Sequence, residues 1–168
     1  MEGVTLSPLA VERVDSLREL WLALHHRHQA VSPVPLVEDD ARSWQARRAV
    51  YTGRLAEGSA FGIVAELGSA AVGYAFCCLH PGPDDTFPVG AQYADLYSLS
   101  VAEAVRGRGI GTRLLDAVDR ELEERDVHDL RISVLAGNER AQRLYERRGL
   151  RVAELVLFRF GSPTGRHA

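Results

Sequence analysis

The sequence predicts an α/β fold in which a mixed, mostly antiparallel central sheet is flanked by helices. Three observations support this prediction: segments whose apolar residues alternate, segments whose apolar residues recur every three or four positions, and the order of these segments. That order is strand, two helices, three strands, helix, strand, helix and strand. With 168 residues, 46% of them hydrophobic, the chain suits one domain over residues 1–160, followed by a flexible tail, 161–168.

Residues 4–6 are expected to form the first strand, and Ser7 and Pro8 to supply an N-cap and a first-turn proline for the next element. A helix is predicted over 11–28, because its apolar residues recur at spacings of three and four: Val14, Leu17, Trp21 and Leu24. The prolines within 30–36 should end this helix, because proline removes a backbone donor and restricts the residue before it.

A second helix is predicted over 38–57, with one apolar side formed by Trp44, Tyr51 and Leu55. Residues 59–67 and 70–79 alternate or run apolar around a Gly-Ser turn, which is typical of a hairpin of two strands. The segment 80–90 contains three prolines and two aspartates, and such a long loop suggests a place at a functional site.

The next strand is predicted over 92–101 and leads into a glycine-rich loop. The helix after this loop should bury Ile110, Leu114, Val118 and Leu122. Further elements are a strand at 130–135, a short helix at 138–148 closed by Gly149, and a last strand at 152–160.

The charge pattern excludes several kinds of partner. Twenty basic and 23 acidic residues are mixed along the chain and give a net charge of −3, so no field favours nucleic acid or an anionic membrane. The N-terminus lacks the pattern of a targeting signal and no apolar run approaches ~20 residues, so we expect a cytoplasmic protein without a membrane partner. The adjacent Cys77 and Cys78 should point to opposite faces of a strand as buried structural thiols, although a strained disulfide between them stays an alternative.

The glycine-rich loop carries the clearest chemical pattern. Gly107, Gly109 and Gly111 stand at alternate positions between a strand and a helix. Such glycines let several backbone N–H groups face one way, and the helix adds unpaired amides and the positive end of its dipole. A pyrophosphate could bind there without a dedicated lysine, and a tight turn without a ligand is the alternative. Neither the dinucleotide nor the nucleoside-triphosphate fingerprint fits this spacing.

Two motifs resemble those of the GNAT superfamily of acyl-CoA N-acyltransferases. Arg106, Gly109 and Gly111 match the Arg/Gln-x-x-Gly-x-Gly/Ala pyrophosphate loop. Downstream, Asn138-x-x-Ala-x-x-Leu-Tyr145-x-x-x-Gly-Leu matches a second pattern of that family. Together the motifs cover about residues 94–150, whereas over 1–90 the resemblance rests on element order alone.

The resemblance implies acetyl-CoA as cosubstrate and a cleft between two splayed strands that holds its pantetheine arm. The coenzyme-binding residues would be Leu99, Ser100, Val101, Arg106, Gly107, Arg108, Gly109, Ile110, Gly111, Thr112, Asn138 and Tyr145. Tyr145 would also protonate the leaving thiolate, since a phenol can donate to a thiol whose ordinary pKa is about 8.5. Packing of the helix is its alternative role, and Asn138 also suits a helix N-cap. Arg106 would touch phosphate or only fix the loop, with Arg108 and Arg113 as accessory charges.

The general base is chosen from the strand before the loop. Similar enzymes often use a carboxylate on this strand, so Asp95 is our choice, with Tyr93 and Tyr97 as alternatives. On a regular strand these three residues would share one face with Leu99 and Val101. A solvated strand-end aspartate is the alternative to a catalytic Asp95.

No metal site is expected, because His25, His26 and His28 lie at a helix end, where solvated histidines favoured by the dipole are the simpler interpretation. These histidines, with Asp39, Asp40, Asp84 and Asp85, lie in segments that should border an acceptor pocket.

The sequence therefore predicts an acetyl-CoA-dependent N-acetyltransferase that acts on a small-molecule or peptide amine by direct attack in a ternary complex, without an acyl-enzyme. The alternative is a non-catalytic acyl-CoA-binding sensor or interaction module on the same fold. Dimerisation is common among similar proteins, often through terminal strands, so a homodimer stays open.

Overall fold

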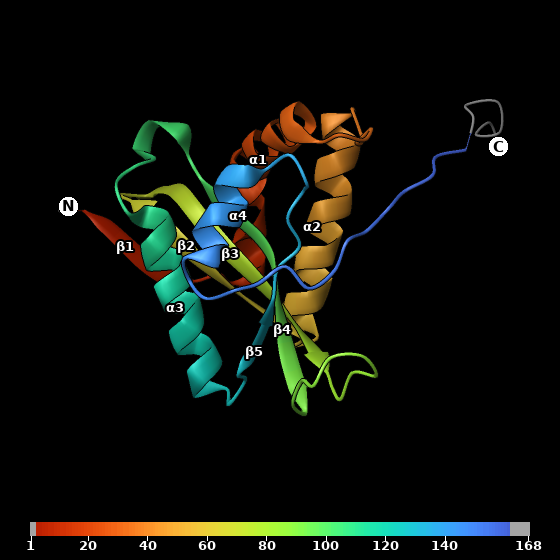
Figure 1. The fold of residues 1–168 in the computed structure, drawn as a ribbon. Helices are drawn as coiled ribbons and strands as arrows, with labels where there is room; N and C mark the ends of the chain where they lie inside the picture. The colour runs from red at the N-terminus through yellow and green to blue at the C-terminus, as the bar shows by residue number, and fades with distance from the viewer. Residues whose placement is uncertain (1–2, 162–168) are drawn as a thin grey trace.

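A computed structural model describes residues 3–161, which form an α/β structure built on one five-stranded sheet (Figure 1). The strand order follows the chain, from β1 to β5. The first three neighbouring pairs are antiparallel and the pair of β4 and β5 is parallel, which confirms the predicted mixed sheet. The strands are β1 (Val4–Pro8), β2 (Ala60–Leu67), β3 (Ala70–Pro81), β4 (Gln92–Val101) and β5 (Asp129–Arg131). Most of the predicted tail lies outside the described residues.

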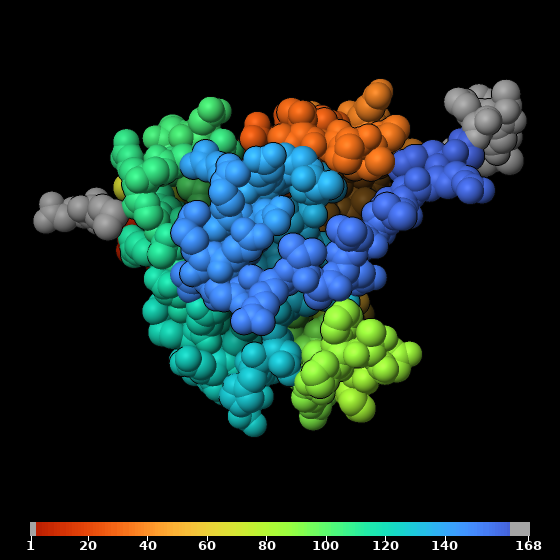
Figure 2. Space-filling model, viewed as in Figure 1, coloured from red at the N-terminus to blue at the C-terminus, as the bar shows by residue number. Residues whose placement is uncertain are grey.

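Helices cover both faces of the sheet, and each face has its own apolar core (Figure 1). One core packs α3 on the sheet, and the other packs η1, α1 and α2 on the opposite face. In the space-filling view, α4 and the residues after it cover the centre of the face to which α3 belongs (Figure 2). The helical elements are η1 (Val11–Leu17), α1 (Arg18–Val31), α2 (Asp40–Ala56), η2 (Glu103–Val105), α3 (Ile110–Glu124) and α4 (Glu139–Glu146).

The start of the first helix differs from the prediction. Ser7 and Pro8 belong to β1, where they pair with Val64 and Ile63, so they do not cap the helix. The outer edge of β1 has no neighbouring strand among the described residues, and proline is tolerated in such an edge strand. Ala10 then precedes a 3₁₀-helix without any side-chain cap, and α-helical geometry begins only at Arg18.

The adjacent cysteines of β3 point into different cores, as alternation predicts. Cys77 lies in the core beneath α3, and Cys78 lies in the core beneath α1 and α2. Both thiols are free and buried, and burial raises the pKa of each above its ordinary value. They therefore stay protonated at neutral pH, which favours the structural interpretation over a nucleophilic one.

A β-bulge interrupts β4 in its middle. Phe76 of β3 pairs with Ser98, whereas the next residue, Cys77, pairs with Leu96, so Tyr97 has no partner on β3. A bulge bends its strand and increases the local twist. Parallel pairing with β5 ends at Asp95, immediately before this bulge. The predicted strand at 130–135 is accordingly too long, since only Asp129–Arg131 pairs with β4.

The predicted last strand is wrong. Residues 152–160 form no strand within 3–161, and Figure 1 shows this part of the chain running away from the sheet. Leu155 and Leu157 are 83% and 93% exposed. Alternating apolar residues fit a half-buried strand, but a strand also needs the backbone of a neighbour, and the pattern does not specify one.

Buried hydroxyl groups tie the bulge to α2. The Tyr51 hydroxyl donates to Ser98 Oγ at 2.6 Å and lies 3.0 Å from the Tyr74 hydroxyl. Tyr51 also stacks on Phe76, with 4.1 Å between ring centroids. Tyr51 and Tyr74 are fully buried, so these hydrogen bonds are shielded from water.

We expect Tyr51→Phe to lower the free energy of unfolding by about 1–3 kcal/mol, because Ser98 and Tyr74 would lose a buried partner. Urea denaturation measures the change. Tyr97→Phe is the matched control, since the Tyr97 side chain is 40% exposed. Equal stability of the two variants would contradict a structural role for the buried hydroxyl network.

Candidate functional site

The second half of β4 leaves one of its edges open. Ala102 donates its N–H to the Val72 carbonyl at 2.9 Å, so its peptide group faces β3. Peptide groups alternate between the two edges of a strand, so those of Val101 and Leu99 face away from β3. Beyond Arg131 no strand among residues 3–161 pairs with this edge. The N–H groups of Leu99 and Val101 and the Leu99 carbonyl are therefore available to a ligand.

The peptide group of Ser100 does not face the open edge of β4. The same alternation turns its peptide group toward β3, where it pairs with Tyr74. Its side-chain hydroxyl donates to the Leu20 carbonyl at 2.9 Å and is buried. Of the three residues predicted to offer backbone groups to a coenzyme, Ser100 instead connects β4 to α1.

The glycine-rich loop connects β4 to α3 and adopts the expected unusual backbone. Gly107 and Gly109 have φ angles of 77° and 76°, a left-handed conformation that costs glycine little. Gly109 is the N-cap of α3, and its carbonyl accepts the first helical hydrogen bond, from Arg113 at 3.0 Å. No side chain caps this end, so the N–H groups of Ile110, Gly111 and Thr112 have no intrahelical partner.

The arginines near the loop play different parts. Arg106 donates from Nε to the Val101 carbonyl at 3.0 Å, which fixes the loop against the open edge of β4. Arg113 donates to the Val4 carbonyl at 3.0 Å and ties α3 to β1. Arg108 is exposed and makes no ion pair within the part of the chain that the structure describes. The backbone N–H groups of the loop, with the exposed Arg108 beside them, thus have a geometry that suits an anion.

Tyr145 lies on α4, on the α3 side of the sheet. Asn138 caps this helix by accepting from the Ala141 N–H at 3.4 Å, as predicted. Tyr145 lines a hollow of about 310 Å³ together with residues of α3 and β5. Burial, followed by the neighbouring Cys77, raises the pKa of Tyr145 to about 12. Its hydroxyl therefore stays protonated and can donate throughout the physiological range.

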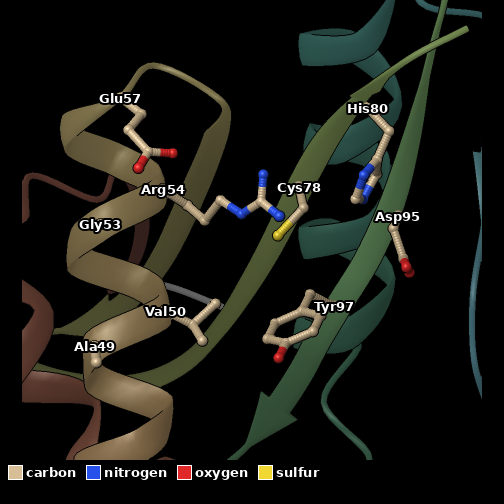
Figure 3. A pocket seen from close by; sticks show the side chains of 9 residues that line it. All are labelled: Ala49, Val50, Gly53, Arg54, Glu57, Cys78, His80, Asp95 and Tyr97. Carbon is tan, nitrogen blue, oxygen red and sulfur yellow. The ribbon is translucent and has the colours of Figure 1, made fainter.

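A larger pocket of about 550 Å³ opens on the α2 side of the sheet (Figure 3). Asp95 lines it, and the Asp95 carboxylate accepts from Arg131 at 2.9 Å. The pocket is lined by Ala49, Val50, Gly53, Arg54 and Glu57 of α2, Cys78 and His80 of β3, and Asp95 and Tyr97 of β4.

The expectation that five alternate residues of β4 share one face is wrong. Asp95 and Tyr97 line the pocket beside α2, but Leu99 and Val101 pack against the core beneath α3. The extra residue at the bulge, Tyr97, shifts the alternation by one position. The bulge thus places a carboxylate on one side of the sheet and the open backbone edge next to the other.

His80 is a site residue that the sequence analysis placed only in a loop. The register of β3 pairs it with Tyr93, and the two rings stack with centroids 5.2 Å apart. Burial lowers the pKa of His80, Asp95 opposes this effect, and Arg131 and Arg54 add to it. A neutral imidazole at pH 7 can accept a proton. The only feature of the sequence that could have placed His80 in this pocket is its position two residues after Cys78, which puts both side chains on one face of β3.

Comparison with known proteins identifies the family. A model of the acetyltransferase (GNAT) family matches residues 15–150, most of the chain. The chain belongs to the GNAT acetyltransferase family. A search of curated proteins finds no match to the chain.

Solved structures share the GNAT fold at low sequence identity. A GCN5-related N-acetyltransferase from Ralstonia eutropha JMP134 is 23% identical with a TM-score of 0.77, covering 94% of this chain and 99% of that one. A predicted acetyltransferase from Clostridium acetobutylicum, solved with acetyl-CoA, is 15% identical with a TM-score of 0.71, covering 98% and 99%. A ribosomal-protein-alanine N-acetyltransferase from Brucella melitensis biovar Abortus 2308 is 20% identical with a TM-score of 0.66, covering 95% and 100%.

The histidines at the end of α1 have structural partners in this GNAT protein. His25 is buried, and its Nε2 lies 2.8 Å from the Val37 carbonyl, while His26 Nε2 lies 2.8 Å from the Asp40 carboxylate. Burial lowers the pKa of His28 to about 4. Within residues 3–161 no three His, Cys, Asp or Glu side chains are placed to hold a metal ion, and no helix is long and apolar enough to span a membrane.

We expect Gly109→Val to weaken acetyl-CoA binding at least tenfold, because a β-branched residue disfavours the left-handed backbone that directs the N–H groups of the loop. Isothermal titration calorimetry measures the affinity. Gly58→Val is the matched control, since Gly58 has a φ of 69° and similar open space but lies after α2. Unchanged affinity in Gly109→Val would refute the assignment of the loop.

Proposed function

We propose that this protein transfers the acetyl group of acetyl-CoA to an amine by direct attack within a ternary complex. The observation that carries the proposal is the open edge of β4, which leads through the glycine-rich loop into the uncapped N-terminus of α3. This arrangement offers backbone groups to an extended amide chain and N–H groups to a pyrophosphate at its end. Membership of the GNAT acetyltransferase family supports acetyl-CoA as the donor.

In this proposal the coenzyme lies along the open edge. The pyrophosphate binds the N–H groups from Gly107 to Thr112 with Arg108 nearby, and the pantetheine amides pair with the backbone of Leu99 and the N–H of Val101. A free N–H at the same edge polarises the thioester carbonyl, because a fixed donor stabilises the negative charge that develops on its oxygen. Arg106 keeps the loop in register with the edge through the Val101 carbonyl.

The acceptor enters from the other side of the sheet, through the pocket beside α2. Its amine nitrogen attacks the thioester carbon, the carbon–sulfur bond breaks, and the thiolate leaves. The thiolate takes a proton from Tyr145, and the amine gives its own proton to a base in the pocket. The bulge joins the two halves of this site, because it places the open edge of β4 directly after the residues that line the pocket.

Two groups in the pocket, Asp95 and His80, are candidates for the general base. Asp95 is 13% exposed at its side chain, and its carboxylate is already engaged in an ion pair with Arg131. His80 is neutral at pH 7 and makes no side-chain hydrogen bond within the described residues. We therefore assign proton acceptance to His80, while Asp95 stabilises the imidazolium that forms.

Direct attack also agrees with the cysteines. An acyl-enzyme would need a thiolate or an activated hydroxyl at the open edge. Cys77 and Cys78 are buried and their pKa values are raised, so neither supplies a thiolate at neutral pH.

The proposal is tested by incubating the purified protein with isotopically labelled acetyl-CoA and a mixture of metabolites, amines and peptides, followed by mass spectrometry. A labelled amide product supports the transferase. Binding of acetyl-CoA without any labelled product would favour the alternative, an acyl-CoA-binding module.

We expect Tyr145→Phe to lower kcat at least tenfold and leave the affinity for acetyl-CoA nearly unchanged, because the variant loses only the proton donor for the thiolate. Steady-state assays of product formation give kcat, and calorimetry gives the affinity for acetyl-CoA. With a pKa of about 12, Tyr145 should add no descending limb to the rate profile below about pH 10. Equal turnover would leave Tyr145 with a packing role only.

We expect His80→Gln to lower kcat/KM about 100-fold at neutral pH, the usual contribution of a general base. In the wild type, activity should fall as pH drops below the lowered pKa of His80, and the variant should lack this limb. Asp95→Asn should move the limb to lower pH, because Asp95 raises the pKa of His80. Deprotonation of the acceptor ammonium adds a second limb to the pH–rate profile, and this limb should be the same in the wild type and in the variants.

His26→Gln is the control for the histidine substitution, because His26 lies on α1 outside the pocket. A low-pH limb that persists in His80→Gln would exclude His80 as the base.

A further inference from the structure

We propose that the acceptor amine also carries a carboxylate, as a free amino acid does, and that Arg54 binds this carboxylate. The inference rests on the proposed function and specifies the substrate class of the same pocket. Neither motif of the sequence involves Arg54, which lies in the last turn of α2.

Arg54 is a cation without an anionic partner in the part of the chain that the structure describes. Its side chain extends from α2 across the pocket, with the guanidinium group beside Cys78 (Figure 3). It makes no ion pair with any carboxylate of residues 3–161. Many other arginines of the protein do have such partners, among them Arg13, Arg48, Arg125, Arg131, Arg143 and Arg148. A half-buried guanidinium that lines a pocket is suited to an incoming carboxylate, which it can bind through two parallel hydrogen bonds.

The acidic residues of the pocket do not compensate Arg54. Asp95 is engaged by Arg131. Glu57 lies one turn after Arg54, is exposed, and accepts a hydrogen bond from Ser59 at 3.3 Å. Figure 3 shows the Glu57 carboxylate at the top of α2, whereas the Arg54 guanidinium points toward β3.

A second unpaired arginine adds to the positive field. Arg47 lies two turns before Arg54 on α2, and its guanidinium lies between two aromatic rings, 3.9 Å from the centroid of Trp21 and 4.2 Å from that of Tyr97. It makes no ion pair within the described residues. Among the lining residues Arg54 is the one arginine and Glu57 and Asp95 are the two carboxylates, and the Asp95 carboxylate is already paired with Arg131.

The size and layout of the pocket fit a small amine that bears a carboxylate. Its volume of about 550 Å³ is in the range of small-molecule sites. Figure 3 shows Arg54 entering from α2 and His80 and Asp95 standing on the opposite strands. A carboxylate at Arg54 would direct the amine of the same molecule toward His80 and the open edge of β4. Ala49, Val50 and Tyr97 offer a surface of low polarity to the remaining side chain.

The test compares matched acceptors that differ only in the carboxylate. The common L-amino acids, their carboxamides and spermidine are each incubated with labelled acetyl-CoA and the full-length protein, and kcat and KM are measured. We expect kcat/KM to be about 10- to 100-fold higher for the best amino acid than for its carboxamide. This preference would oppose solution chemistry, because the carboxamide has the larger fraction of free amine at neutral pH.

Substitution of Arg54 tests the assignment. Arg54→Gln should raise KM for the amino acid to that of its carboxamide with kcat much less affected, and Arg54→Glu should reverse the preference. Arg42→Gln is the matched control, since Arg42 is exposed in the first turn of the same helix and should retain the wild-type preference. Circular dichroism and acetyl-CoA affinity, which should match the wild type, report whether the variants fold.

The outcomes separate the two proposals. Acetylation of the carboxamides or spermidine as well as or better than the amino acids would overturn the carboxylate assignment and keep the transferase. A carboxylate preference that persists in Arg54→Gln would overturn the role of Arg54. No product from any amine, including a panel of peptides, with acetyl-CoA bound, would overturn the proposed function itself.

Discussion

The constraint on which the site depends is the unequal pairing of the two edges of β4. One edge pairs with β3 from Gln92 to Val101, whereas the other pairs with β5 only as far as Asp95. The unpaired peptide groups that remain need partners, because backbone donors and acceptors are costly to leave unsatisfied away from water. The Arg106 side chain satisfies one of them, the Val101 carbonyl. In the proposed function a coenzyme satisfies the others.

The bulge at Tyr97 connects this open edge to the pocket on the other face of the sheet. Without the extra residue, Asp95 would share a face with Leu99, and the acidic group would lie beneath α3. The bulge is stabilised from the α2 face of the sheet by the buried hydroxyl of Tyr51, which donates to Ser98. The packing of α2 therefore fixes the course of β4 and supplies a wall of the pocket at the same time.

In the two proposals, local charge matches two anionic groups, the pyrophosphate of the coenzyme and the carboxylate of the acceptor. The net charge of −3 gives no general attraction for anions, so each anionic group must be bound locally. In the proposed function the loop before α3 does this with backbone N–H groups, which need no particular side chain. In the proposed substrate assignment the pocket does it with the guanidinium group of Arg54, which lacks a carboxylate partner among the described residues. The backbone N–H groups of the loop can be expected from the glycines in the sequence. An arginine without a carboxylate partner is recognisable only when the ion pairs are known.

The sequence alone determined the order of the elements as far as α4, the buried faces of the helices and the position of the glycine-rich loop. These features are local: the φ angles of Gly107 and Gly109, and the burial of Ile110 and Leu114 on one helix face, follow from neighbouring residues. Residues 94–150 accordingly carried the family resemblance that the family model confirms.

Apart from the predicted hairpin of β2 and β3, only the tertiary structure decided which strands pair and where the pairing ends. The bulge, the early end of β5 and the unpaired segment 152–160 depend on backbone partners that are distant in the sequence. His80 and Arg54 also could not be assigned to one pocket from the sequence. They are 26 positions apart, and only the register of β3 and the packing of α2 bring them together. An alternating pattern determines which side chains face a core, but not which backbone lies beside a strand.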